Sequence, residues 1–180
     1  MCWIGTHADA IGKIAEKDII AYKVLYEEKM PISHKFLGYY SPYQEMEYKK
    51  GETYKQGIIP YSNSNYVNRY EIKQGLHLYS DECSIFITEF CSVFVVYANV
   101  KQYDETFGIY NQHCATYHCN YKNGSRTPCL AKCKIPAGTK YYINERGEIA
   151  SEKIEVISII STQFWTKKEK FKLNHFNNIL

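Results

Sequence analysis

The most regular pattern of apolar and polar positions lies in the last third of the chain, between Leu130 and Ile160. Apolar and polar residues partly alternate there, β-branched residues dominate, and turn residues divide the stretch into extended runs. The Pro-Ala-Gly run at 136–138 makes the first turn, because proline fixes φ and glycine permits positive φ; a polar run at 144–147 makes the second. The pattern predicts consecutive strands, of which Ile154–Ile160 is mostly buried.

Other stretches have the composition of strands, with β-branched or aromatic residues bounded by charges or turn residues. They are residues 18–25, 36–40, 74–79 and 93–100, and the last of these is the most apolar. A glycine also divides two polar-aromatic runs within 47–54, which predicts a hairpin or a bulge.

Two stretches favour helices. Ser80 precedes two acidic residues, as at a helix start, and apolar residues then recur at three- and four-residue spacing to about Phe90. The basic and aromatic tail, 161–180, is compatible with an amphipathic helix or with a packed or frayed end. We therefore expect an α+β fold: a mostly antiparallel sheet of about six to eight strands, one main helix at 80–90 and a possible C-terminal helix.

Composition agrees with one ordinary domain spanning 1–180, with its core in 18–160 and a tail in 161–180. Charged residues make up 23% and the apolar set 45% of the 180 residues, which is normal for a soluble globular protein. The 18 tyrosines suit half-exposed sheets or stacking surfaces. A net charge of +3 is too small to indicate nucleic acid as a partner.

The chain shows no apolar run at its start and no stretch near the roughly 20 apolar residues of a membrane span. We therefore expect a cytoplasmic protein with no membrane partner. In that compartment the seven cysteines are thiols or metal ligands more readily than disulfides.

One group of residues suits zinc. Cysteines and histidines gather in and just after a long irregular stretch, and a closed four-ligand site would keep such a loop ordered. The proposed ligands are the cysteines, with the histidines as substitutes: Cys114, Cys119, Cys129, Cys133, His113 and His118. Ordinary core and surface thiols are the alternative, and a disulfide is a third interpretation. Ordinary thiols are the favoured interpretation, so we expect no cofactor, and structural zinc is the exception that these residues would allow.

A second group surrounds the run Gly-Leu-His-Leu-Tyr-Ser at 75–80. Together with Tyr-Lys-Val-Leu at 22–25 and two late glutamates, Glu152 and Glu155, it resembles the layout of ADP-ribosyltransferases. Those enzymes place an aromatic or basic residue on an early strand, a Gly-x-x-x-Ser-type strand before a helix, and an acid on a late strand.

This resemblance implies an NAD site. Tyr79 or His77 would bracket nicotinamide, Ser80 would bond its amide or ribose, and one of the late glutamates would stabilise the oxocarbenium-like transition state. The alternative interpretation makes His77 a hydrogen-bonded strand residue and Ser80 a helix cap.

Cys2 supplies a third hypothesis. Removal of Met1 would leave an N-terminal cysteine with a thiol and an amine, which resembles the pairing of N-terminal-nucleophile amidohydrolases. A small apolar residue without a catalytic role is the alternative.

The order of short motifs over 18–160 resembles a family of small uncharacterised cytosolic proteins of bacteria and phages. The motifs are Tyr-Lys-Val-Leu at 22–25, Ser-Pro-Tyr at 41–43, Gly-Leu-His at 75–77 and Ile-Pro-x-Gly-Thr-x-Tyr-Tyr at 135–142. This resemblance implies a single-domain fold and no particular activity.

The sequence thus favours a non-catalytic binding or interaction module, whose partner is an unidentified protein or small molecule. An NAD- or nucleotide-binding domain and an N-terminal-cysteine hydrolase are the other two hypotheses, and NAD is a cofactor only under the first of them.

Overall fold

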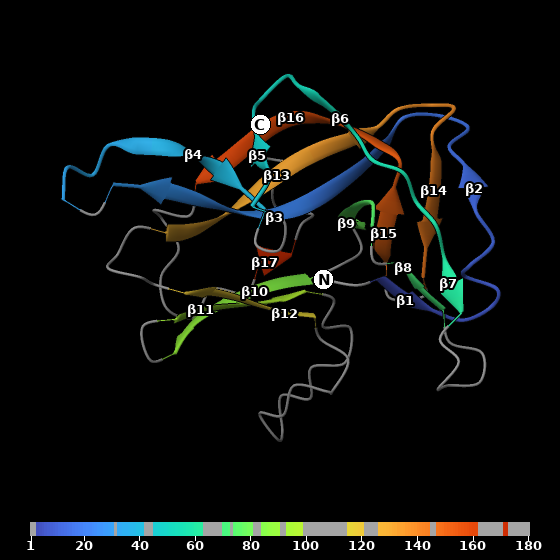
Figure 1. The fold of residues 1–180 in the computed structure, drawn as a ribbon, viewed down its shortest axis with the longest axis horizontal. Coiled ribbons are helices and arrows are strands. Elements are labelled where there is room, and N and C mark those ends of the chain that lie inside the picture. The colour runs from blue at the N-terminus through green and yellow to red at the C-terminus, as the bar shows by residue number, and fades with distance from the viewer. Residues whose placement is uncertain are drawn as a thin grey trace.

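A computed structural model describes residues 3–30, 32–41, 45–62, 70–72, 74–80, 84–90, 93–98, 115–120, 126–144, 147–161 and 171–172. This described part consists of β-strands and their connections and contains no helix. All the pairings between its strands are antiparallel, in three sheets (Figure 1).

The main sheet has ten strands: β2 (Lys13–Ile14), β3 (Ile19–Lys29), β4 (Phe36–Tyr40), β5 (Glu47–Tyr48), β6 (Thr53–Lys55), β9 (Leu76–Ser80), β13 (Arg126–Ile135), β14 (Lys140–Ile143), β15 (Glu148–Ser151) and β16 (Lys153–Ser161). A four-stranded sheet contains β10 (Ser84–Phe90), β11 (Val93–Ala98), β12 (Ala115–Asn120) and β17 (Phe171–Lys172). A three-stranded sheet contains β1 (Trp3–Gly5), β7 (Tyr61–Ser62) and β8 (Tyr70–Ile72).

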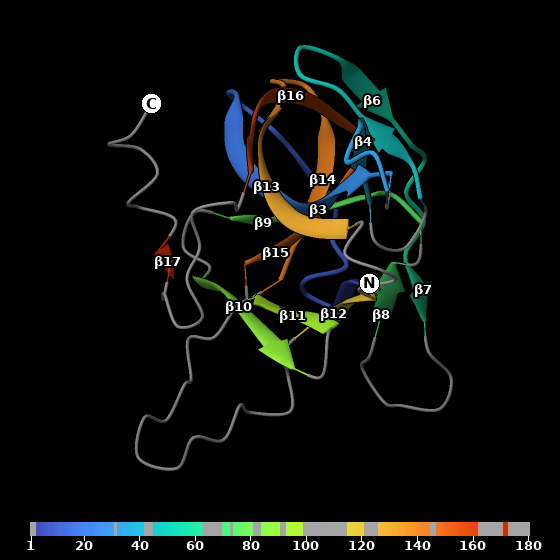
Figure 2. The same cartoon turned by 90° about the vertical axis from the view of Figure 1, so that its left-hand side faces the viewer.

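Part of the main sheet closes on itself. One edge of β3 pairs with β13, and the other edge pairs with β9 near its start and with β4 near its end. β4 pairs with β5, a short turn leads into β6, β6 pairs with β16, and β16 pairs with β13. The order β3–β4–β5–β6–β16–β13 therefore returns to β3 and encloses an interior, which Figure 2 shows at the top of the view.

The turn between β5 and β6 is fastened on both sides. Gly51 has φ of 83°, in the left-handed region that glycine tolerates, and its N–H donates to the Val156 carbonyl at 2.8 Å. The rings of Tyr48 and Tyr54 lie 4.6 Å apart between centroids, and the Tyr54 hydroxyl accepts from the Lys49 N–H at 2.7 Å. These contacts join β5 to β6 where no ladder does.

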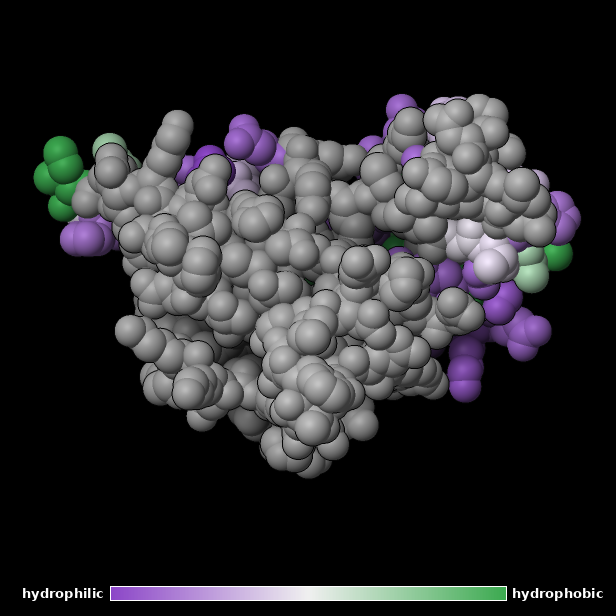
Figure 3. All heavy atoms as spheres, turned by 90° about the horizontal axis from the view of Figure 1, so that it is seen from below, coloured by the Kyte–Doolittle hydropathy of each residue, from purple (hydrophilic) through white to green (hydrophobic). Residues whose placement is uncertain are grey.

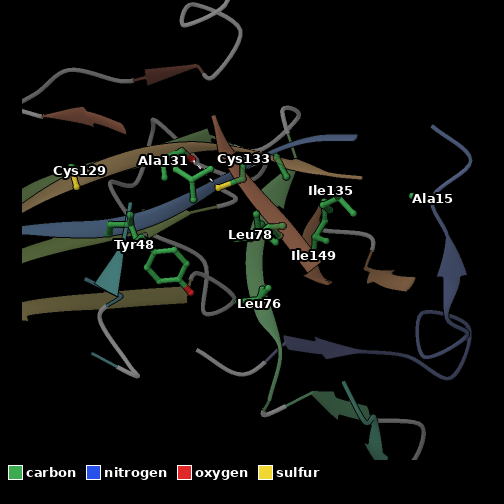
Figure 4. Close-up of a cluster of buried hydrophobic side chains, with 13 residues drawn as sticks. Ala15, Tyr48, Leu76, Leu78, Cys129, Ala131, Cys133, Ile135 and Ile149 are labelled. Carbon is green, nitrogen blue, oxygen red and sulfur yellow. Dashed lines mark hydrogen bonds between the residues drawn. The ribbon is translucent and has the colours of Figure 1, made fainter. Parts of the chain in front are cut away.

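Side chains of β3 and β13 alternate between the interior and the opposite face, as the two-residue period of a strand requires. Leu25 and the β13 residues Cys129, Ala131 and Cys133 are buried in one cluster with Val156 of β16. Figure 4 shows this cluster, with Tyr48 beside it. Full burial of each large aliphatic side chain contributes about 1.5–3 kcal/mol, so this cluster is a main source of stability.

The three strands predicted within 130–160 are confirmed as β13, β14 and β16, and the structure adds a fourth, β15, between the second turn and β16. The Pro-Ala-Gly turn at 136–138 joins β13 to β14, but these strands do not pair with each other. The turn is held instead by the chain before β3: the Gly138 N–H donates to the Ala15 carbonyl at 2.7 Å, and the Ala137 N–H donates to Asp18 Oδ1 at 2.9 Å.

The α+β prediction is wrong. The helix predicted for 80–90 is instead the end of β9 and the strand β10, which pairs with β11 over six residue pairs. The apolar spacing of Phe86, Ile87 and Phe90 fits a helix, but the segment is also rich in β-branched and aromatic residues, and pairing with an apolar neighbour decides for a strand.

The predicted C-terminal helix is also wrong for the part of the tail that the structure describes. Phe171–Lys172 is the strand β17 and pairs with β10. The extra ladder gives its backbone the hydrogen bonds that a helix would have made internally.

Candidate functional site

Lys23 lies in the interior that the main sheet encloses. It occupies the face of β3 that also carries Ala21 and Leu25, because strand residues two apart share a face. Only 8% of Lys23 is exposed. An interior lysine is unusual, since a charged amine loses its hydration there.

The amine of Lys23 contacts a backbone carbonyl and lies near an aromatic ring. Its Nζ donates to the backbone carbonyl of His77 at 3.0 Å, and it lies 5.2 Å from the ring centroid of Tyr48. The pairing of β3 with β9 stops at Tyr22 and Tyr79, so the two strands part just where this carbonyl lies. The lysine thus takes the place of a strand N–H.

Burial controls the ionisation of this group. Loss of solvent lowers the pKa of Lys23 to about 8, although the nearby Cys133 opposes the shift. Burial also raises the pKa of the Cys133 thiol to about 12, so this cysteine is a neutral thiol at neutral pH and a poor nucleophile. Burial likewise raises the pKa of Tyr48, whose hydroxyl has no hydrogen-bond partner among the described residues.

His77 is buried with its ring on the other face of β9 from Leu76 and Leu78. Neither ring nitrogen finds a hydrogen-bond partner within the described part of the chain. Burial, followed by the charge of Lys23, lowers the pKa of His77 to about 3. The imidazole is therefore neutral at ordinary pH, far from the pKa that suits a general base near pH 7.

The other residues of the predicted NAD site are divided between faces. Tyr79 lies opposite Tyr22 and shares its face with His77, whereas Ser80 lies on the other face of β9. The Ser80 N–H donates to the Gly147 carbonyl at 2.8 Å. The structure therefore brings Tyr79 and His77 to one face and places Ser80 on the opposite one.

The two late glutamates lie on or beside β16. Glu155 forms an ion pair with Lys134 at 2.7 Å. Glu152 lies between β15 and β16, where its backbone N–H donates to the Lys140 carbonyl at 3.1 Å and its carbonyl accepts from Gln56 at 2.9 Å. No contact joins either carboxylate to His77 among the described residues, and the NAD site stays a prediction.

The predicted zinc ligands are placed only in part. Cys129 and Cys133 are buried thiols of β13, and they lie four residues apart along one extended strand. Four residues of strand span roughly 13 Å, so the two thiols cannot bind one zinc ion, whose bonds to sulfur are about 2.3 Å long.

The remaining predicted zinc ligands belong to the chain before β13. Cys119 and His118 belong to β12 by backbone, while Cys114 and His113 lie outside the described residues. Cys2, the nucleophile of the hydrolase hypothesis, also lies outside them. Within the described part, no group of three or more His, Cys, Asp or Glu side chains could hold a metal ion.

A different feature stands out on the surface, at the end of the hairpin formed by β3 and β4. Four apolar side chains there form what we call the hairpin tip: Met30, Ile32, Phe36 and Leu37. Ile32 is 95% exposed, and the other three are 44–48% exposed. The hairpin projects from the left of the molecule in Figure 1, and apolar residues stand out at the same end in Figure 3.

The turn at the end of this hairpin is hydrogen-bonded. The Met30 N–H donates to the Lys35 carbonyl at 2.8 Å, and the His34 N–H donates to the Met30 carbonyl at 3.0 Å. The Lys35 N–H donates to Ser33 Oγ at 3.4 Å. The apolar side chains are therefore presented by a defined turn.

The base of the hairpin is held from a neighbouring strand. Arg126 of β13 donates to Glu28 at 3.0 Å and lies 4.4 Å from the ring centroid of Tyr26, which stacks on Tyr40 at 5.7 Å. The bond to Glu28 contributes to the raised pKa of Arg126. Contacts of this kind fix the direction in which the hairpin tip points.

The sequence analysis missed both the interior lysine and the hairpin tip. The interior lysine could have been found from the two-residue period of the strand. This period places Lys23 on the same face as the apolar residues Ile19, Ala21 and Leu25. The second was visible as a short run of large apolar residues around a proline, where a loop is ordinarily polar.

Comparison with protein-family models, curated proteins and solved structures finds no match to this chain. Within its described residues, the chain forms no helix of the length and apolar character that crossing a membrane requires.

Proposed function

We propose that this protein is a non-catalytic interaction module that contacts its partner through the hairpin tip. The exposure of four large apolar side chains within eight residues, on a projecting hairpin, is the observation that carries the proposal. Large apolar side chains that are exposed together in one short segment mark interaction sites, whereas apolar residues scattered singly over a surface do not.

The energetics support a contact of moderate strength. Full burial of a large apolar side chain contributes about 1.5–3 kcal/mol, and a half-exposed side chain gains roughly half of that. Ile32, as the most exposed residue of the hairpin tip, has the most to gain from a partner. Because the turn and the base of the hairpin are already fixed by hydrogen bonds, little ordering would oppose binding.

The closed part of the main sheet acts as the scaffold in this proposal. It holds β3 from Ile19 to Glu28 through β13, and β3 leads into the hairpin tip at its end. A cytoplasmic location, as expected from the sequence, is part of the same proposal.

Comparative capture tests the proposal. The full chain, its Ile32→Asp variant and its Ile59→Asp variant are used as baits in cell extract, and bound proteins and lipids are quantified. Ile59 is the matched control, because it is 57% exposed and lies just before β7, at the other end of the molecule (Figure 1).

We expect a set of bound species that the Ile59→Asp variant retains and that Ile32→Asp reduces about tenfold, a loss of about 1.4 kcal/mol. Equal binding by all three baits would show that the hairpin tip is not the contact surface.

A further inference from the structure

The residues that flank the hairpin tip carry positive charge. The segment 29–38 contains Lys29 and Lys35 and no aspartate or glutamate. Glu27 pairs with Lys29 at 2.8 Å and Glu28 accepts from Arg126 at 3.0 Å, so the acids that precede the segment are neutralised and Lys35 adds a positive charge beside the hairpin tip. An apolar tip beside a cation complements a surface that is apolar beneath and anionic on top.

The side chains are also arranged by depth along the hairpin. Ile32 lies in the turn beyond the last pair of the ladder, which is formed by Lys29 and the half-exposed Phe36. The ring centroids of Phe36 and Tyr39 are 4.9 Å apart. Tyr40 stacks on Tyr26 at the base. A lipid interface takes up apolar side chains at greater depth and tyrosines at the level of the headgroups. The order of side chains along the hairpin matches this arrangement.

The backbone of the turn is suited to a lipid interface. The Met30, His34 and Lys35 N–H groups each donate to an oxygen within the turn. Backbone groups that enter a bilayer unsatisfied are costly, and these three are satisfied before contact.

A protein partner fits the hairpin tip less well. Stable protein complexes bury roughly 800 Å² on each side, more than four side chains at the end of a hairpin supply. A lipid surface sets no such requirement, because each side chain is taken up separately and reversible binding needs only a few of them together with basic residues.

We propose that the hairpin tip binds the surface of an anionic lipid bilayer, with Ile32 and Phe36 inserted to the level of the headgroups and Lys35 facing the lipid phosphates. This inference rests on the proposed function, because it names the partner of the same contact surface. The expectation of no membrane partner was based on the lack of an apolar span, whereas a hairpin that enters only the interface needs no span.

Vesicle co-sedimentation of the full chain tests this inference. The vesicles contain phosphatidylcholine alone or with about 30% phosphatidylserine, an anionic lipid. We expect the protein to sediment with the anionic vesicles and to lose about tenfold in affinity with Ile32→Asp, while Ile59→Asp has no effect. Lys35→Glu should weaken binding to anionic vesicles, and added salt should do the same.

Thermal unfolding of each variant provides the control for folding, and Ile32→Ser is a milder second variant at the same exposed position. The inference is overturned if the protein stays in the supernatant with both kinds of vesicle, or if Ile32→Asp binds as the original chain does. Capture of a protein that depends on Ile32, without vesicle binding, would overturn the lipid partner and leave the proposed function in place. If neither assay depends on Ile32, both proposals fail.

Discussion

Replacement of Lys23 by methionine tests whether a lysine in the closed interior controls the stability of the fold. The variant keeps an unbranched side chain of similar length and removes the amine that donates to the His77 carbonyl. That carbonyl then lacks a donor, which costs about 1–3 kcal/mol. The variant also no longer has to place an ammonium group in the interior.

The magnitude follows from the pKa of Lys23, which burial lowers from 10.5 to about 8. A pKa lowered by folding means that the unfolded chain holds the proton more tightly, so the free energy of unfolding rises with pH between the two values. From pH 7 to about pH 9.5 this contribution is about 2 kcal/mol. At pH 7 the full penalty is about 3 kcal/mol, which offsets the lost hydrogen bond.

The upper limit of the pH window is set by tyrosines. Burial raises the pKa of Tyr48 above its usual range and that of Tyr54 to about 12. An acid whose folded pKa is raised contributes stability that is lost as pH rises through its unfolded value of about 10. Measurements up to about pH 9.5 therefore avoid the tyrosines. The Cys133 thiol, whose pKa burial raises from 9.0 to about 12, loses its contribution to stability within this range, but it does so in both chains, so the comparison with Lys23→Met isolates the lysine.

Urea unfolding of the original chain and of Lys23→Met, at about pH 7 and about pH 9.5, gives the difference directly. We expect the original chain to gain about 2 kcal/mol more than the variant over this range. Lys132→Met on the adjacent strand β13, on the opposite face, is the control and should retain the gain. A difference between the original chain and Lys23→Met that stays constant with pH would refute the argument.

Two further variants test the contacts that hold the strands together. Asn144→Ala removes a buried side chain that donates to Glu148 Oε2 at 2.7 Å and accepts from the Glu148 N–H at 3.0 Å, so we expect a loss of about 2–4 kcal/mol in urea unfolding; a loss under about 0.5 kcal/mol would contradict this. Tyr54→Phe removes the hydroxyl that joins the Lys49 N–H to Glu52, and thermal unfolding should show a cost of about 1 kcal/mol, whereas an unchanged midpoint would show that this turn needs no such bond.

Much of the strand content could be predicted from local pattern. Phe36–Tyr40 has the predicted bounds, and the strands after Leu130 follow their turn residues. The sequence of 80–90 alone does not exclude a helix, because its apolar residues fit the period of a helix as well as that of a strand. The segment becomes a strand because β10 pairs with β11, and this partner lies outside the segment.

Pairing partners were beyond the reach of the sequence for the same reason. The turn at 136–138 could be predicted, but the partners of the two strands that it joins could not. β13 pairs with β3 and β16, whereas β14 pairs with β2 and β15. The burial of Lys23 follows from closure of the sheet around it, which no local pattern encodes. The exposure of Ile32 depends equally on which strands lack a neighbour at that end.

Site-specific photo-crosslinking in cells tests the role of the hairpin tip most directly. A benzophenone amino acid is placed at position 32 or, as the control, at position 59 of the full chain, and protein and lipid adducts are quantified after irradiation. We predict adducts from position 32 that decrease when Phe36→Asp is added, and few from position 59. Equal yields from both positions, or yields from position 32 that do not respond to Phe36→Asp, would contradict the account.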